Sequence, residues 1–71
     1  MKRNISYTHL IVKSVNTYEI EDYFNINEKY NGIFIEDEFR VYSSEFILHC
    51  NLEFFKRRFK ILKRKMVMKD E

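Results

Sequence analysis

The sequence contains one cysteine, one glycine, no proline and no tryptophan in 71 residues. With Cys50 alone, an intramolecular disulfide is excluded, which favours a reducing compartment. A single glycine excludes a glycine-rich phosphate-binding loop. No apolar run reaches the length of a signal peptide or a membrane span. We therefore expect a cytoplasmic protein that does not interact with membranes, in the bacterial host cytoplasm if it is of phage origin.

Residues suited to catalysis or metal binding are equally scarce. His9 and His49 are the only histidines. Because His49 and Cys50 are adjacent, their side chains point to different sides in either a helix or a strand, whereas a Cys-His pair must converge. Two histidines and one cysteine without a ligand spacing make a weak metal site. The sequence predicts no enzyme, no cofactor and no metal, and indicates a protein that acts by binding.

Apolar residues, by contrast, are plentiful for so short a chain. They make up 45% of the sequence, and 17% of it is aromatic. We expect one domain over residues 1–71, with a thin stability margin because a small domain buries only about 60–65% of its unfolded surface. Part of the apolar surface is expected to be buried in a homodimer or against a partner.

The net charge of +2 conceals three regions of different sign. Residues 1–18 carry three basic side chains and no acidic ones, and residues 19–45 carry eight acidic against two basic. Residues 46–71 carry eight basic against three acidic. The acidic middle and the basic end can attract each other within a dimer or meet different partner surfaces.

The first half of the chain predicts mainly strands, over residues 1–43. Residues 5–13 are dense in β-branched and aromatic side chains, which predicts a central strand. A capping-box pattern favours a short helix at about 17–24, with a second strand over 16–24 as the alternative. Asn31-Gly32 predicts a type I′ hairpin turn between a strand ending near Tyr30 and another starting at Ile33.

The strand that would follow this turn has an apolar face. Ile33, Ile35, Phe39 and Val41 are expected to share it. The acidic run at 36–38 interrupts the pattern, so a bulge or tight turn is expected there.

The C-terminal part predicts a long helix over residues 51–68, with Asn51 as its N-cap. A start at Ser43 or Ser44 is an alternative, as is a last strand over 44–50. Its apolar residues step by three and four positions, which is typical of a helix packed on one face. This stripe consists of Leu48, Leu52, Phe55, Phe59, Leu62 and Met66.

A second apolar stripe lies on nearly the opposite side of the same helix. It consists of Phe54, Ile61 and Met68. A helix that packs once needs only one such stripe, so we expect the second to form a dimer interface. The predicted fold class is therefore α+β: a small antiparallel sheet of about three strands with a long C-terminal helix packed on it.

The predicted helix is also strongly basic. Its cations are Lys56, Arg57, Arg58, Lys60, Lys63, Arg64 and Lys65. Such a helix could follow the phosphates of a nucleic acid. On a helical wheel the cations are dispersed between the two apolar stripes, which makes a nucleic-acid-binding module the alternative interpretation rather than the first.

The acidic middle offers a different recognition surface. Its candidate carboxylates are Glu19, Glu21, Asp22, Glu36, Asp37 and Glu38. Acidic side chains on a strand-rich surface can imitate a phosphate backbone and occupy a DNA-binding protein.

One short motif favours a particular partner. Asn51-Leu52-Glu53-Phe54-Phe55 resembles the peptide by which bacterial polymerases and repair proteins bind the replicative sliding clamp, usually written Gln-Leu-x-Leu-Phe. Leu52 and Phe55 match that pattern, and Asn51 and Phe54 are conservative departures. In this mode apolar side chains fill a groove and an amide fixes the register.

Size, the acidic middle, the motif and a composition typical of AT-rich genomes together resemble phage-encoded host-takeover proteins. Among such proteins, this sequence most resembles the sliding-clamp inhibitors of staphylococcal phages such as Twort. That resemblance implies a homodimer that blocks the DNA channel or polymerase-docking groove of a host DNA-replication protein, with the sliding clamp as the expected partner. The carboxylates named above would then face the cations of the channel, and Asn51, Leu52 and Phe55 would contact the groove.

Overall fold

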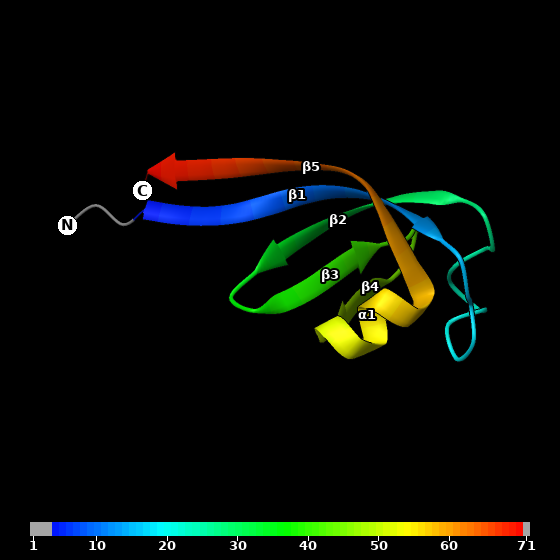
Figure 1. Cartoon of the computed structure of the whole chain (residues 1–71). Helices are drawn as coiled ribbons and strands as arrows, with labels where there is room; N and C mark the ends of the chain where they lie inside the picture. The colour runs from blue at the N-terminus through cyan, green and yellow to red at the C-terminus, as the bar shows by residue number, and fades with distance from the viewer. Residues whose placement is uncertain (1–3, 71) are drawn as a thin grey trace.

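The computed structural model describes residues 4–70, with side chains from Ser6 to Met68. It is a five-stranded antiparallel sheet with one short helix (Figure 1). The strands are β1 (Asn4–Ser14), β2 (Lys29–Ile35), β3 (Glu38–Tyr42), β4 (Ile47–Cys50) and β5 (Phe59–Asp70), and the helix is α1 (Leu52–Arg58). Their order across the sheet is β4-β3-β2-β1-β5. The prediction of three strands under a long helix is therefore wrong.

The first strand lies inside the sheet, as predicted. β1 pairs with β2 along one side and with β5 along the other. Its β-branched and aromatic side chains fit a pleated, half-buried surface. In Figure 1, β1 and β5 run together past the turn between β2 and β3, which gives the molecule a long axis of 43 Å against 23 Å and 19 Å.

The hairpin turn between β2 and β3 is at Glu36-Asp37, and the prediction of a turn at Asn31-Gly32 is wrong. Glu36 and Asp37 have φ of 51° and 63°, as a type I′ turn requires. Asn31 and Gly32 lie within β2 and pair with both neighbouring strands. A Cβ at Gly32 would stand 2.8 Å from the carbonyl oxygen of Arg40, so this glycine permits a close approach of backbones rather than a turn.

The position of this turn decides which side chains share a face. Ile33 pairs with Arg40, while Gly32 pairs with Val41. Because paired residues lie on the same face and successive residues alternate, Ile33 and Ile35 point away from Phe39 and Val41. The expected shared face of these four residues is wrong.

The predicted helix over 51–68 is correct only in its first two turns. Asn51 is the N-cap, as predicted, and its side-chain oxygen accepts a hydrogen bond from the Phe54 N–H at 2.9 Å. The helix ends at Arg58, and the chain continues as β5. Pairing with β1 gives β5 backbone hydrogen-bond partners on one side along its length, so tertiary contacts override the helical pattern.

The apolar stripe expected of that helix divides accordingly. Phe55 and Phe59 are buried, whereas Leu52, Leu62 and Met66 are exposed. Leu62 is the extra residue of a β-bulge, since Ile11 pairs with Lys63 and Val12 with Ile61. The alternative of a strand within 44–50 is confirmed by β4, although β4 is not the last strand because β5 follows it.

The segment between β1 and β2 is neither the helix nor the strand considered for it. It forms hydrogen-bonded turns, in which the N–H of Ile20 bonds to the Thr17 carbonyl and that of Phe24 to the Ile20 carbonyl. The Asn16 side chain accepts from the Tyr18 N–H, an Asx turn that ends β1. Ile20 and Phe24 are buried, so this loop supplies part of the core.

The core lies between one face of the sheet, the helix α1 and this loop. Aromatic rings form its centre: Phe55 stacks on Phe39 with centroids 4.0 Å apart, and Phe24 meets Phe59 edge-on at 5.4 Å. Leu10, Val12 and further apolar side chains of the sheet surround them. We call this side of the sheet the covered face and the other side the open face.

Candidate functional site

The two faces of the sheet differ sharply in burial. On the covered face, β1 contributes Leu10, Val12 and Ser14, all of them buried. On the open face, the alternate residues His9, Ile11 and Lys13 are only half-buried. Among the side chains that the structure describes, none on the open face is buried. A sheet face that no other described element covers is the first candidate for a binding site in a protein this short.

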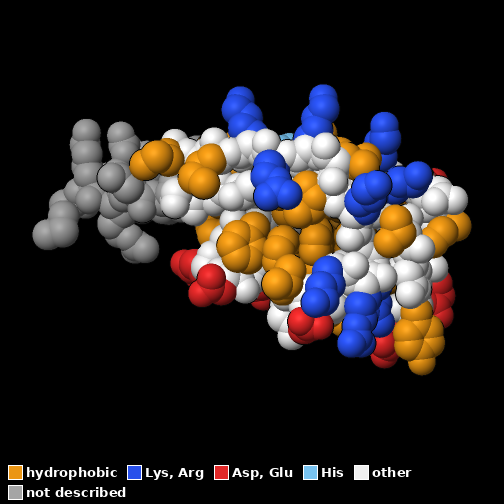
Figure 2. Space-filling view, viewed as in Figure 1, with side chains coloured by type: hydrophobic (Ala, Val, Ile, Leu, Met, Phe, Trp, Pro, Cys, Tyr) orange, Lys and Arg blue, Asp and Glu red, His pale blue; other side chains and the backbone are white. Residues whose placement is uncertain are grey.

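Lysines from three neighbouring strands meet on the open face. Lys13 of β1 pairs with Lys29 of β2 on one side and with Lys60 of β5 on the other. These three lysines form a row across the sheet, about 10 Å long at the usual spacing of strands. Lys63 and Lys65 continue the positive charge along β5, opposite Ile11 and His9. Figure 2 shows blue side chains along β5.

Apolar and aromatic side chains lie beside these cations on the same face. Tyr7 and His9 come from β1, and Tyr42 of β3 follows Asn31 and Ile11 across the sheet. A hollow of about 310 Å³ opens beside Tyr42 and Ile11, with Lys29 and Asn31 on its rim. The open face therefore combines positive charge with flat, accessible ring surfaces.

Glu38 is an acidic residue on the otherwise positively charged open face, and its carboxylate is paired with neighbouring side chains. It accepts a hydrogen bond from the Arg40 Nε at 2.8 Å and contacts the His49 Nδ1 at 3.2 Å. The Arg40 hydrogen bond, with a smaller contribution from His49, lowers the pKa of Glu38 below its ordinary value of 4.5. This pair leaves the lysines of the open face without a nearby free carboxylate on the described strands.

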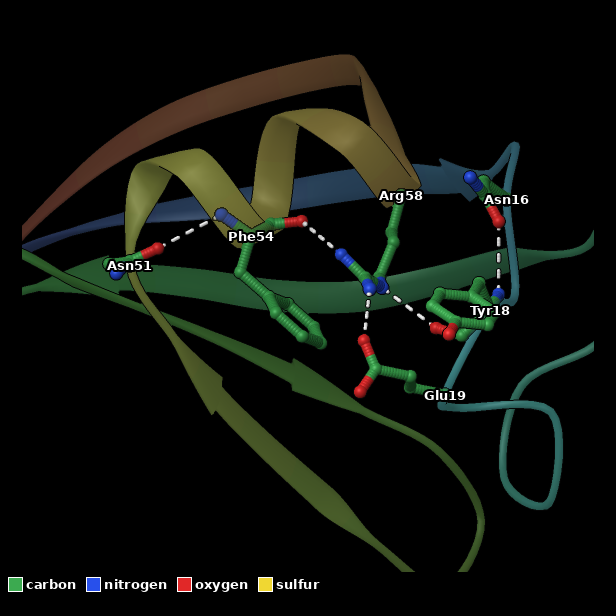
Figure 3. A network of polar contacts seen from close by, with 6 residues as sticks. All are labelled: Asn16, Tyr18, Glu19, Asn51, Phe54 and Arg58. Atoms are coloured by element: carbon green, nitrogen blue, oxygen red, sulfur yellow. Dashed lines mark hydrogen bonds and ion pairs between the residues drawn. The ribbon is translucent and has the colours of Figure 1, made fainter.

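A buried arginine joins the two segments that cover the core. Arg58, the last residue of α1, has a side chain only 8% exposed (Figure 3). Its Nε donates to the Tyr18 carbonyl at 2.8 Å, one terminal nitrogen bonds to the Glu19 carboxylate at 2.9 Å, and its guanidinium lies 3.7 Å from the centre of the Phe54 ring. The Arg58 carbonyl accepts from the Val15 N–H. This residue joins α1 to the loop that covers the core, so it is structural.

The structure does not bring the predicted acidic residues together. Glu19, Glu21 and Asp22 belong to the loop before β2, whereas Glu36 and Asp37 form the turn after it and Glu38 begins β3. The two groups lie at opposite ends of β2, which spans about 20 Å at its length of seven residues. Figure 1 shows this loop and this turn at the two ends of the strand pair.

The clamp-like segment is folded into the helix. Phe55 is 2% exposed and packs in the core, while Leu52 is 56% exposed. The Asn51 side chain caps α1. These side chains do not form a continuous docking surface in this conformation. Inhibition of a sliding clamp stays a prediction, since no comparison bears on it.

The residues predicted for a dimer interface also separate. Phe54 is half-buried under the Arg58 guanidinium, and Ile61 packs against the core. Met68 is exposed far along β5. The helical stripe that would have united them does not exist, because residues 59–70 form a strand.

The basic residues predicted for nucleic acid divide between different surfaces. Lys60, Lys63 and Lys65 reach the open face, Arg64 lies on the covered face and Arg58 is buried. The remaining two, Lys56 and Arg57, are exposed on α1. The sequence did not identify Lys13, Lys29 and Arg40 as members of this surface, because their meeting depends on strand register.

The described residues contain no arrangement of side chains suited to thiol chemistry or metal binding. Burial, with a smaller contribution from the Glu38 carboxylate, raises the pKa of Cys50 to about 11, so this thiol stays protonated at neutral pH. Among the described residues, no group of His, Cys, Asp and Glu side chains is arranged to hold a metal ion. Within the same residues, α1 is too short to span a membrane.

Comparison with known proteins gives no match, whether against protein-family models, curated proteins or solved structures.

Proposed function

We propose that this protein binds single-stranded nucleic acid on the open face of its sheet. The observation that carries the proposal is the row of Lys29, Lys13 and Lys60 across three strands, continued by Lys63 and Lys65 along β5. This surface replaces the basic helix of the earlier interpretation, since the residues from Phe59 onward form a strand.

The lysines would contact phosphates. Each lysine carries its charge on a flexible stem, so the group suits a backbone whose phosphates vary in position. Binding of this kind releases condensed counterions and weakens steeply as salt increases. The Glu38 carboxylate, which would repel phosphates, is neutralised by Arg40.

The aromatic side chains would contact bases. Tyr7 and Tyr42 are half-buried, so each ring is held by the sheet and still accessible from outside. Bases stack on such rings with about 1–3 kcal/mol each, and only unpaired bases expose their faces. The hollow beside Tyr42 gives one base a place with apolar contact and a polar rim. A single strand therefore fits this surface better than a duplex.

The test measures the binding of fluorescein-labelled single-stranded DNA and RNA of about twelve nucleotides by anisotropy, at several salt concentrations. The doubly substituted variant Lys63→Gln, Lys65→Gln should reduce the slope of log K against log salt by about 1.4, since each single-strand phosphate contact contributes about 0.7. Arg64→Gln is the matched control, because Arg64 lies between them on the same strand but on the covered face. Its salt slope should equal that of the unmodified protein.

A second variant separates single strand from duplex. Tyr42→Leu keeps an apolar side chain on β3 but removes the ring, so it should weaken single-strand binding by roughly tenfold while leaving duplex binding unchanged. The proposal fails if no oligonucleotide binds at low salt. It also fails if Arg64→Gln lowers the salt slope as much as the double variant.

A further inference from the structure

A groove on the covered face borders the core and lies on the opposite side of the sheet from the proposed nucleic-acid surface. It has a volume of about 500 Å³ and lies where β1 and β5 extend past the helix. Leu10, Phe34, Phe39 and Ile61 form its apolar walls, and Met66 stands at its mouth. Figure 2 shows apolar side chains gathered on this face below β5 and beside α1.

The groove lies next to an unpaired strand edge. Within the described residues, β5 pairs with β1 alone and forms one border of the sheet. Such a border presents N–H and C=O groups that can hydrogen-bond an added strand. Main-chain bonds to an edge and side-chain pockets beside it together make up one of the general modes of peptide recognition.

The positive charge of β5 determines which kind of strand can pair with its edge. Between Phe59 and Met68 this strand carries Lys60, Lys63, Arg64 and Lys65 and no acidic residue. A second copy of β5 along the same edge would bring like charges opposite one another, which destabilises a strand pair. An acidic strand would form favourable cross-strand pairs instead.

The two faces of β5 set the pattern of that strand. Lys63 and Lys65 point to the open face, whereas Arg64 and Met66 point to the groove. Side chains of an added strand would alternate in the same way. Acidic residues would then meet the lysines, and the residues between them would enter the groove.

We propose that the free edge of β5 binds an extended peptide segment of a partner protein in which acidic and large apolar residues alternate. The acidic side chains pair with Lys63 and Lys65, and the apolar side chains fill the groove at Ile61 and Met66. This site is separate from the nucleic-acid surface except for the two lysines, so an acidic peptide and a nucleic acid would compete.

The probe is a fluorescein-labelled peptide, Ser-Glu-Leu-Glu-Phe-Glu-Leu-Ser, measured by anisotropy with the whole protein. A peptide of the same composition with its acidic and apolar residues in separate blocks tests the pattern, and it should bind at least about tenfold more weakly. Met66→Glu places a carboxylate at the mouth of the groove, where it should lower affinity for the alternating peptide by about tenfold or more.

Met68→Glu is the matched control. Met66 and Met68 lie on the same strand and face and are each 69% exposed, but only Met66 lines the groove. Met68→Glu should keep most of the affinity, and circular dichroism should show both variants folded.

The proposal is overturned if the alternating peptide does not bind, if the block peptide binds equally well, or if the two variants lose affinity alike. If the unmodified protein binds the alternating peptide but no oligonucleotide, the nucleic-acid proposal fails and the peptide proposal stands. The two failures are therefore distinguishable.

Discussion

The covered and open faces of the sheet belong to the same five strands, yet they obey different constraints. On the covered face, side chains such as Val12 and Val41 are completely buried, and α1 and the loop before β2 seal them from water. On the open face, the neighbours of these residues remain partly accessible, and two of them, Lys13 and Arg40, carry charge. Strand alternation thus lets one set of backbone hydrogen bonds support a core on one side and a charged surface on the other.

This comparison separates stability from function. A substitution on the covered face should change the free energy of unfolding, while a substitution of an exposed lysine on the open face should change binding with little effect on folding. The following variants test the division, in order of decreasing effect.

Arg58→Ala should have the largest effect on stability. It removes the hydrogen bonds to Tyr18 and Glu19 and the contact with the Phe54 ring, so the loop loses its side-chain attachment to α1. Hydrogen bonds from a buried charged group and a close cation–π contact predict a loss of about 3 kcal/mol in the free energy of unfolding, measured by urea denaturation.

The control for this variant is Glu19→Ala. The Glu19 side chain is 61% exposed, so solvent screening should limit its loss to below about 1 kcal/mol. Equal losses for the two variants would show that the ion pair, rather than the buried guanidinium, holds the loop.

Gly32→Ala tests the backbone that both faces share. The added methyl group would meet the Arg40 carbonyl oxygen at 2.8 Å, which forces β2 and β3 apart. We expect a loss of about 2 kcal/mol, within the usual cost of overpacking. Asn31→Ala alters the exposed neighbour and should change stability by less than about 0.5 kcal/mol. A stable Gly32→Ala protein would mean that the strands separate at little cost.

Lowering the pH should produce the smallest effect, confined to the open face. The hydrogen bond from Arg40 lowers the pKa of Glu38 below 4.5, so the stabilising contribution of this carboxylate is complete above about pH 4.5. It is lost as the pH falls through the lowered pKa of the folded state. NMR titration should show the Glu38 side chain of Arg40→Ala titrating closer to 4.5 than that of the unmodified protein.

The His49→Gln variant sharpens this test. His49 is a lesser cause of the lowered pKa than Arg40, so its replacement should move the titration midpoint of Glu38 by a smaller amount. A larger movement for His49→Gln would reverse the assigned order of the two interactions.

Local features of the sequence predicted local features of the fold. The β-branched run of β1 predicted a strand with neighbours on both sides, Asn51 predicted an N-cap, and the acidic run at 36–38 predicted a tight turn. Each of these depends on residues close together in the chain, where propensity and capping act directly.

The prediction of a long helix failed because the apolar spacing of a short helix and that of the following strand together resembled the spacing of one long helix. The three-and-four spacing from Leu52 to Met66 combines a true helix with a strand whose alternation is shifted by the bulge at Leu62. The strand pattern could not be recognised from the sequence because the residues of β1 that pair with β5 lie 45 (Ser14 with Phe59) to 66 (Asn4 with Asp70) positions earlier. The site was only partly visible for the same reason: Lys63 and Lys65 were identified as basic candidates, but the row through Lys13 and Lys29 exists only once the register is known.

The pairing of β1 with β5 also has a kinetic consequence. Its register joins Asn4 with Asp70 and Ser14 with Phe59, so closing this pair means closing a loop of most of the chain. Loop closure of this length is entropically costly before the contacts compensate for it, and such non-local sheets fold in milliseconds to seconds. We expect the local hairpin of β2 and β3 to form first and the strand that carries most of the exposed lysines to join last. The surface proposed to bind nucleic acid would then be assembled only in the final step of folding.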